Sequence, residues 1–209
     1  MVGHSPKLTS AEISMLWSTY IGDTMGNCVL SHFLMTCEDE EIKPILEFAI
    51  ESSKEHVTQI TDLFNKEGIP LPNGFGKQDV NLQAKKLFSD VTYMRYLHHM
   101  GRTGLNSYSL AKSISARKDV RDLFKSFYNQ AETLYDRNVE LQQDKGVFIR
   151  APYISYPEKV EYITEQNFLG GLIVHKRPLL AIEIAHVGVN IEVSNIAKTM
   201  LLGFSQVAQ

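Results

Sequence analysis

The chain has 209 residues, of which 44% are hydrophobic and 22% charged, a composition typical of a globular protein with one core. It excludes an intrinsically disordered chain, a collagen-like repeat and a disulfide-stabilised miniprotein. The formal net charge of −3 lacks the basic character of a nucleic-acid-binding domain, so no nucleic-acid partner is expected.

The first predicted helix runs from the Thr9 to Glu12 capping-box pattern to about Thr36. In this pattern the Thr9 hydroxyl accepts from the Glu12 amide, and the Glu12 carboxylate accepts from the Thr9 amide. Apolar residues follow at steps of three and four along one face, which Asp23 and Asn27 interrupt. The interruption predicts a polar layer in the middle of the protein.

Cysteine spacing and the N-terminus together favour a cytoplasmic location. Cys28 and Cys37 lie more than two turns apart on the first predicted helix, too far to form a disulfide with each other. Residues 1–10 contain no apolar stretch, so no secretory signal peptide is expected.

The second predicted helix begins near Glu40 or Glu41, because Pro44 is tolerated only in a first turn. It ends at Gly68, a residue suited to a left-handed cap. One face of this helix combines apolar residues with Ser53 and His56.

The third and fourth predicted helices cover about 88–115 and 118–145. Small residues on the third helix, among them Gly101 and Gly104, indicate close packing against a neighbour. The mixed-charge run 117–122 is interpreted as a solvated helix start.

Loop lengths predict the topology. The first and second helices, and the third and fourth, have short connections, which make antiparallel neighbours. The segment 68–87 is long enough, at about 3.3 Å per extended residue, to run the length of the helices beside it. The prediction is an all-α, ferritin-like up-down-down-up four-helix bundle whose long crossover lies on its outside.

Residues 147–178 form a predicted linker with one short helix around 158–168. A fifth helix begins at Pro178 and is apolar nearly all round, so most of its surface needs cover. A membrane span is the competing interpretation, but polar residues such as Glu183, Asn190 and Lys198 make it costly. No membrane partner is expected.

Four polar residues are candidate metal ligands in one mid-bundle layer: Asp23, His56, His98 and Glu132. Counting outward from the loop between the first two helices places His56 opposite Tyr20 to Asp23. Two-metal bundles use Glu-x-x-His on two helices, because this spacing puts both ligands on one inner face. Here Ser53 stands three residues before His56, and Tyr135 three residues after Glu132, so both motifs are broken.

Three interpretations of this layer stay open. It is a set of hydrogen-bonded polar groups that fixes helix register, a mononuclear or degenerate metal site, or a di-iron centre. Iron, manganese and zinc are the candidate metals. Glu183 and His186 form a true Glu-x-x-His, but at the start of the fifth helix, and Glu12 is better explained as a capping acid.

The fifth helix repeats part of the first. A shift of 171 residues aligns four identities, pairing Glu183 and Ile184 with Glu12 and Ile13, and Leu201 and Phe204 with Leu30 and Phe33. Several segments resemble tandem ferritin-like proteins of unknown function from endospore-forming bacteria, which are related to spore-coat F-type proteins. They include LTSAEISMLWSTYIGDTMGNCVLSHFL (8–34), FNKEGIPLPNGF (64–75), APYISYPEKV (151–160) and RPLLAIEIAHVGVNI (177–191).

The resemblance implies two four-helix bundles per chain. The expected domains are a bundle at 1–146, a linker at 147–178, and at 179–209 the first helix of a second, truncated bundle. That helix is expected to pack on its own bundle or on another copy, and a homo-oligomer through 179–209 is predicted. The preferred function is a non-enzymatic structural or interaction protein, cytoplasmic or spore-associated. The alternative is a metal-binding carboxylate–histidine bundle with an oxidase-like or storage role.

Overall fold

The computed structural model describes residues 6–156, 158–160 and 179–205, and within them helices are the only regular elements. The helices are α1 (Ser10–Thr36), α2 (Lys43–Glu67), the short 3-10 helix η1 (Lys77–Asp79), α3 (Asp90–Ile114), α4 (Lys118–Asp144) and α5 (Ala181–Ser205). The all-α prediction is confirmed. Most of the short helix expected at 158–168 lies outside the described residues.

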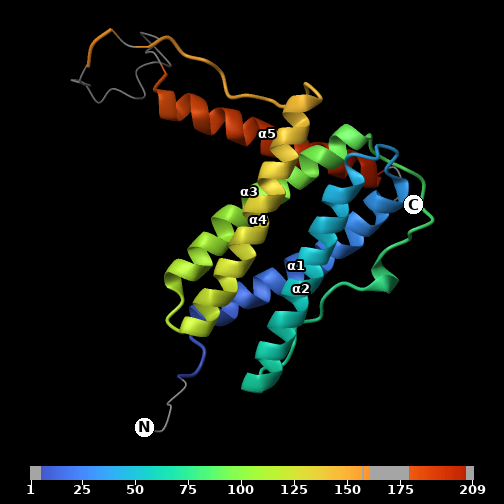
Figure 1. Ribbon diagram of the computed structural model, residues 1–209, viewed down its shortest axis with the longest axis vertical. Coiled ribbons are helices and arrows are strands. Elements are labelled where there is room, and N and C mark those ends of the chain that lie inside the picture. Colours follow the sequence, from blue (N-terminus) through green and yellow to red (C-terminus); the bar gives the residue numbers. More distant parts are fainter. Residues whose placement is uncertain (1–5, 157, 161–178, 206–209) are drawn as a thin grey trace. The chain divides into compact units, whose positions relative to one another are not determined.

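The chain folds as two units, Met1–Phe148 and Ile149–Gln209. In the first unit, α1 and α4 run in one direction and α2 and α3 in the other (Figure 1). Helix α1 packs on α2 and α3, and α4 packs on the same two helices, so all adjacent pairs are antiparallel. The up-down-down-up order of the helices is the predicted one. The relationship to ferritins stays a prediction.

Most helix ends lie where their local sequence predicts them. The Thr9 amide donates to Glu12 Oε2 at 2.7 Å and the Glu12 amide to Thr9 Oγ1 at 3.3 Å, and Gly68 caps α2 with φ of 67°. Helix α2 begins at Lys43, later than predicted, because residues 40–42 form a turn that the Asp39 side chain holds through the Glu41 amide.

The start of α3 also differs from the prediction. It begins at Asp90, whose carboxylate accepts from the amides of Glu38 and Asp39 at 3.2 and 3.1 Å. Asp90 therefore joins α3 to the loop between α1 and α2, at the end of the bundle where the crossover arrives (Figure 1).

The crossover 68–89 is held against α1. Cys28 donates to the Gly76 carbonyl at 3.4 Å, and a ring nitrogen of His32 lies 3.1 Å from the Ala84 carbonyl oxygen. Gly74 lies so close to α1 that a Cβ there would come within 2.8 to 2.9 Å of Thr24 and Tyr20. The prediction that this segment runs along the outside of the bundle is confirmed.

Gly74→Ala is expected to destabilise the protein by about 1 to 3 kcal/mol, because the new methyl group overpacks the contact between crossover and α1. Gly22→Ala is the matched control, since a Cβ at Gly22 meets no atom within 4 Å. It is expected to stabilise α1 by up to about 1 kcal/mol. Urea unfolding of both variants measures the difference, and equal stabilities would contradict the described packing.

Close packing of α3 on α4 occurs at the predicted glycines. A Cβ at Gly104 would approach the Ala131 Cβ to 2.7 Å, and a Cβ at Gly101 would lie 3.1 Å from the Tyr135 backbone. The apolar core forms on both sides of this contact. At one end Phe124 and Phe127 pack edge-to-face, and at the other Phe33 stacks on Tyr93 at 4.1 Å.

The charge run at the start of α4 is solvated as predicted at Lys118, Asp119 and Asp122, but not at Arg117. Arg117 is buried, and its guanidinium contacts Glu67 at 2.8 Å and Asp119 at 2.7 Å. Its amide donates to Glu12 Oε1 at 2.8 Å. The Glu12 carboxylate therefore caps α1 and also binds the residue before α4. Arg117 is tolerated in the interior because its amide and guanidinium both have hydrogen-bond partners.

Glu12 is expected to make stability depend on pH. Burial acts to raise the pKa of Glu12, but hydrogen bonds from Thr9, Arg117 and Ala116 outweigh it and lower the pKa below the usual 4.5. A lowered pKa adds stability above pH 4.5 that is lost as pH falls through the folded-state value. Glu12→Gln is expected to lower the free energy of unfolding by about 1 to 2 kcal/mol at neutral pH, and by less in acid. Urea unfolding from pH 7 to 3 measures this, and a pH-independent difference would contradict it.

Candidate functional site

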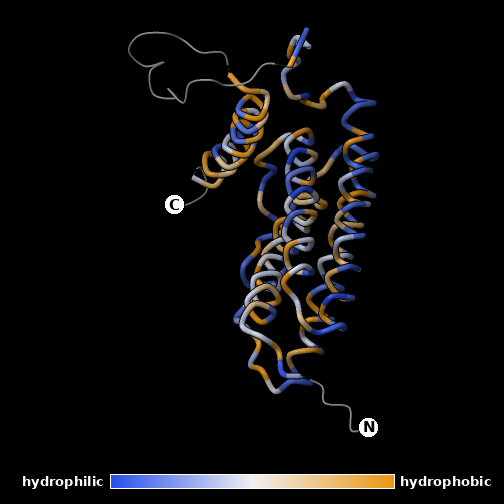
Figure 2. Tube along the Cα trace, turned by 90° about the vertical axis from the view of Figure 1, so that its left-hand side faces the viewer, coloured by the Kyte–Doolittle hydropathy of each residue, from blue (hydrophilic) through white to orange (hydrophobic). Residues whose placement is uncertain are grey.

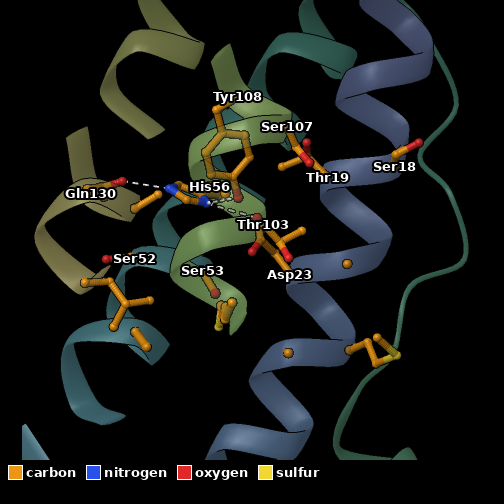
Figure 3. Close-up of a pocket in the computed structure, with 18 of the residues that line it drawn as sticks. Ser18, Thr19, Asp23, Ser52, Ser53, His56, Thr103, Ser107, Tyr108 and Gln130 are labelled. Carbon is orange, nitrogen blue, oxygen red and sulfur yellow. Dashed lines mark hydrogen bonds and ion pairs between the residues drawn. The ribbon is translucent and has the colours of Figure 1, made fainter. Parts of the chain in front are cut away.

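A cavity of about 340 Å³ lies among α1, α2, α3 and α4 of the first unit (Figure 3). It opens to solvent, since its lining residues Ser18, Gly22 and Met25 are exposed. Its apolar lining includes Met15, Met25, Met100 and Leu134, and all four helices also contribute polar side chains. The cavity lies in the layer that Asp23 and His56 predict.

Asp23 of α1 and His56 of α2 form a buried pair at this cavity. His56 Nδ1 lies 3.0 Å from Asp23 Oδ2, and both side chains are nearly inaccessible to solvent. Counting along the sequence predicts this contact, and the structure places it there. A pair that bridges two antiparallel helices fixes their register, because a shift of one turn would leave both polar groups buried without partners.

The second nitrogen of His56 faces α4. Nε2 lies 2.7 Å from Gln130 Oε1, and Gln130 Nε2 donates to Glu55 Oε2 at 2.7 Å. Because Gln130 uses its amide nitrogen toward Glu55, its oxygen accepts from His56 Nε2. Both ring nitrogens of His56 therefore have acceptors, a carboxylate on one side and an amide oxygen on the other.

Tyr108 of α3 completes the polar group. Its hydroxyl lies 3.4 Å from His56 Nδ1, and the two rings meet edge to face. Burial and, after it, the charge of Asp23 raise the pKa of the Tyr108 phenol well above its usual value. Tyr108 therefore remains an uncharged hydroxyl beside the pair.

The other two predicted ligands lie elsewhere. His98 is buried next to Gln142, whose Nε2 is 3.4 Å from His98 Nδ1, and beside the rings of Tyr135 and Phe148. Glu132 is exposed on the outside of α4. The structure brings together Asp23 and His56 and separates them from His98 and Glu132.

The residues at the cavity do not fit a two-metal centre. In the part of the chain that the structure describes, no three His, Cys, Asp or Glu side chains meet as a metal site. His56 directs both nitrogens at protein acceptors, so the lining offers only Asp23 and His99 as further residues of metal-ligand type. On α5, Glu183 accepts from the Leu180 amide at 2.9 Å and so caps its helix.

Sequence reasoning missed Gln130 and Glu55 as members of the site. Both lie toward the outer surface, where apolar periodicity gives no signal. Ser53 shares the face of α2 with His56, as the sequence predicts, and is buried there together with Ser52. The sequence also contains Gly22 and Gly26 one turn apart on α1, both of which line the cavity.

Comparisons with known proteins agree with the bundle. The sequence profile of a family described as "Protein of unknown function (DUF3231)" matches residues 1–160. A crystal structure of a "putative spore coat protein" from Bacillus halodurans C-125 has a similar fold, with a TM-score of 0.65 and 21% identity. The match covers 72% of this chain and 98% of that one. No curated protein matches the chain.

His56→Ala is expected to lower the free energy of unfolding by about 3 kcal/mol, because it leaves Asp23 buried without its partner. The content of iron, manganese and zinc in the purified protein should not change. Glu132→Ala, at an exposed position, is the control and is expected to stay within about 0.5 kcal/mol of the parent. Loss of a stoichiometric metal on His56→Ala, measured by mass spectrometry, would contradict this assignment.

Proposed function

The chain belongs to the DUF3231 family of proteins of unknown function, and on this premise we propose a non-enzymatic structural protein that associates with further copies of itself. The proposal rests mainly on α5. This helix has 25 residues, and hydrophobic residues recur along its whole length (Figure 2). An apolar surface of this extent is a marker of protein interaction.

Exposed apolar side chains are spread over more than one face of α5. They include Ile182, Val187, Ile191, Leu201 and Phe204, of which Leu201 is 70% exposed. A second copy of the same helix would cover such a surface, and a two-fold axis would satisfy both copies at once. We therefore assign α5 to self-association rather than to contact with an unrelated protein.

A non-enzymatic role is supported by the chemistry of the described residues. In the buried pair of Asp23 and His56, both imidazole nitrogens contact protein acceptors. The imidazole therefore offers no free nitrogen to act as a general base. Burial raises the pKa of the thiols of Cys28 and Cys37, which makes both poor nucleophiles.

A location in the spore-forming cell, in the cytoplasm or on the spore, is part of the proposal. It is supported by the similarity to a protein described as a spore coat component and by the two free cysteines. Among the described residues, every helix is too short or too polar to cross a membrane.

The double variant Val187→Glu with Leu201→Glu is expected to shift the protein from dimer toward monomer, because two carboxylates in an apolar interface lose their hydration. Asn195→Glu, at an exposed polar position of the same helix, is the matched control and should leave the dimer intact.

Light scattering coupled to gel filtration, over a hundredfold range of concentration, measures the change. A parent protein that is monomeric at every concentration would contradict self-association. A dimer that persists in the double variant would place the interface away from α5.

A further inference from the structure

The cavity among α1 to α4 is large enough for a small organic molecule. Its volume of about 340 Å³ lies at the lower end of the range for ligand pockets. Three methionines, Met15, Met25 and Met100, contribute flexible thioethers that adapt to apolar and aromatic groups. Polar side chains from all four helices lie among the apolar ones, so the cavity can also bind a polar group of an otherwise apolar ligand (Figure 3).

Two glycines of α1, Gly22 and Gly26, leave space in the cavity because they have no side chain. A Cβ at Gly22 would meet no atom within 4 Å, and one at Gly26 would meet only the Met100 methyl group at 3.8 Å. Neither glycine has a positive φ, so a turn does not explain them. Both residues line the cavity, and larger side chains there would occupy its volume.

Ser53 provides an unused polar group on the opposite wall. Its side chain is 1% exposed, and its hydroxyl has no hydrogen-bond partner within the described part of the chain. Buried hydroxyl groups are rarely left without a partner, since the lost hydration is not recovered. Ser53 lines the cavity together with Asp23 and His56. Rotation about χ1 would bring its hydroxyl to a polar group of a guest molecule there.

The charges around the cavity favour an uncharged guest. Asp23 is paired with His56, and Tyr108 remains neutral, so neither an anion nor a cation meets an unpaired counter-charge there. His56 contacts Oδ2 of Asp23, and a guest hydroxyl would donate to the other carboxylate oxygen. A hydroxyl group on the guest can bind both residues, because it donates a hydrogen bond to the Asp23 carboxylate and accepts one from the Ser53 hydroxyl.

We propose that this cavity binds an uncharged, mainly apolar small molecule that carries a hydroxyl group. The hydroxyl binds between Ser53 and Asp23, and the apolar body packs among the methionines and along Gly22 and Gly26. The site is built from residues of the first unit alone, and the binding test is carried out whatever the oligomeric state.

Naphthalene derivatives test the proposal, since their own fluorescence reports binding and their volume suits the cavity. The probes are 1-naphthol, 1-methylnaphthalene, 1-naphthoate and 1-naphthylmethylammonium, titrated with the full chain at neutral pH. We expect 1-naphthol to bind roughly 3- to 10-fold more tightly than 1-methylnaphthalene, the effect of one net hydrogen bond. Both charged probes should bind more weakly than 1-naphthol.

Two variants assign the binding to this cavity. Ser53→Ala removes an unpaired hydroxyl and is expected to fold normally; 1-naphthol should then bind about as weakly as 1-methylnaphthalene. Gly22→Leu fills the cavity and should weaken both probes at least 10-fold. Ser14→Leu adds the same side chain at an exposed position of α1 and should leave the affinity for both probes unchanged.

The proposal is overturned if none of the probes binds, or if a charged probe binds most tightly. It is also overturned if Gly22→Leu leaves binding unchanged, which places the probes elsewhere on the protein. If Ser53→Ala keeps the preference for 1-naphthol, the hydroxyl specificity assigned to Ser53 is wrong.

Discussion

The buried contact between Asp23 and His56 is the constraint on which the rest of the first unit depends. It joins α1 to α2 at mid-height, and through Gln130 it extends to α4. Apolar side chains alone would tolerate a shift of one helix turn, because any similar residue fills the same space. A buried polar pair does not, since each partner satisfies the other only in one register. The cavity follows from the same layer, where glycines and short hydroxyl side chains surround the pair and leave volume that larger residues would fill.

Polar contacts also close the two ends of the bundle. At one end the Glu12 carboxylate receives amides from Thr9 and Arg117, which brings the starts of α1 and α4 together. At the other end Asp90 receives two amides of the loop between α1 and α2, which fixes where α3 begins after the crossover. Each connection joins segments distant in sequence. The helix order therefore depends on a few charge-assisted hydrogen bonds as well as on apolar burial.

Much of the fold follows from local sequence. The capping box predicts the start of α1, Gly68 predicts the end of α2, and loop length predicts the crossover. The contact of Asp23 with His56 follows because two helices joined by a short loop can be counted outward from it. His98 and Glu132 could not be placed in this way, since rotation of α3 and α4 about their axes depends on packing. The rotation that the structure shows turns Glu132 to solvent and His98 toward Gln142. Burial of Arg117 was missed because its partners, Glu67 and the loop before α1, are remote in sequence.

A double-mutant cycle of Asp23→Ala and His56→Ala, measured by urea unfolding, tests most directly whether this pair fixes the register. If it does, either single substitution leaves a buried polar group without its partner, and the second substitution then costs little more. The expected interaction energy between the two positions is about 1 to 3 kcal/mol. Losses that add within about 0.5 kcal/mol would show that the two residues do not act as a unit, and would contradict the account.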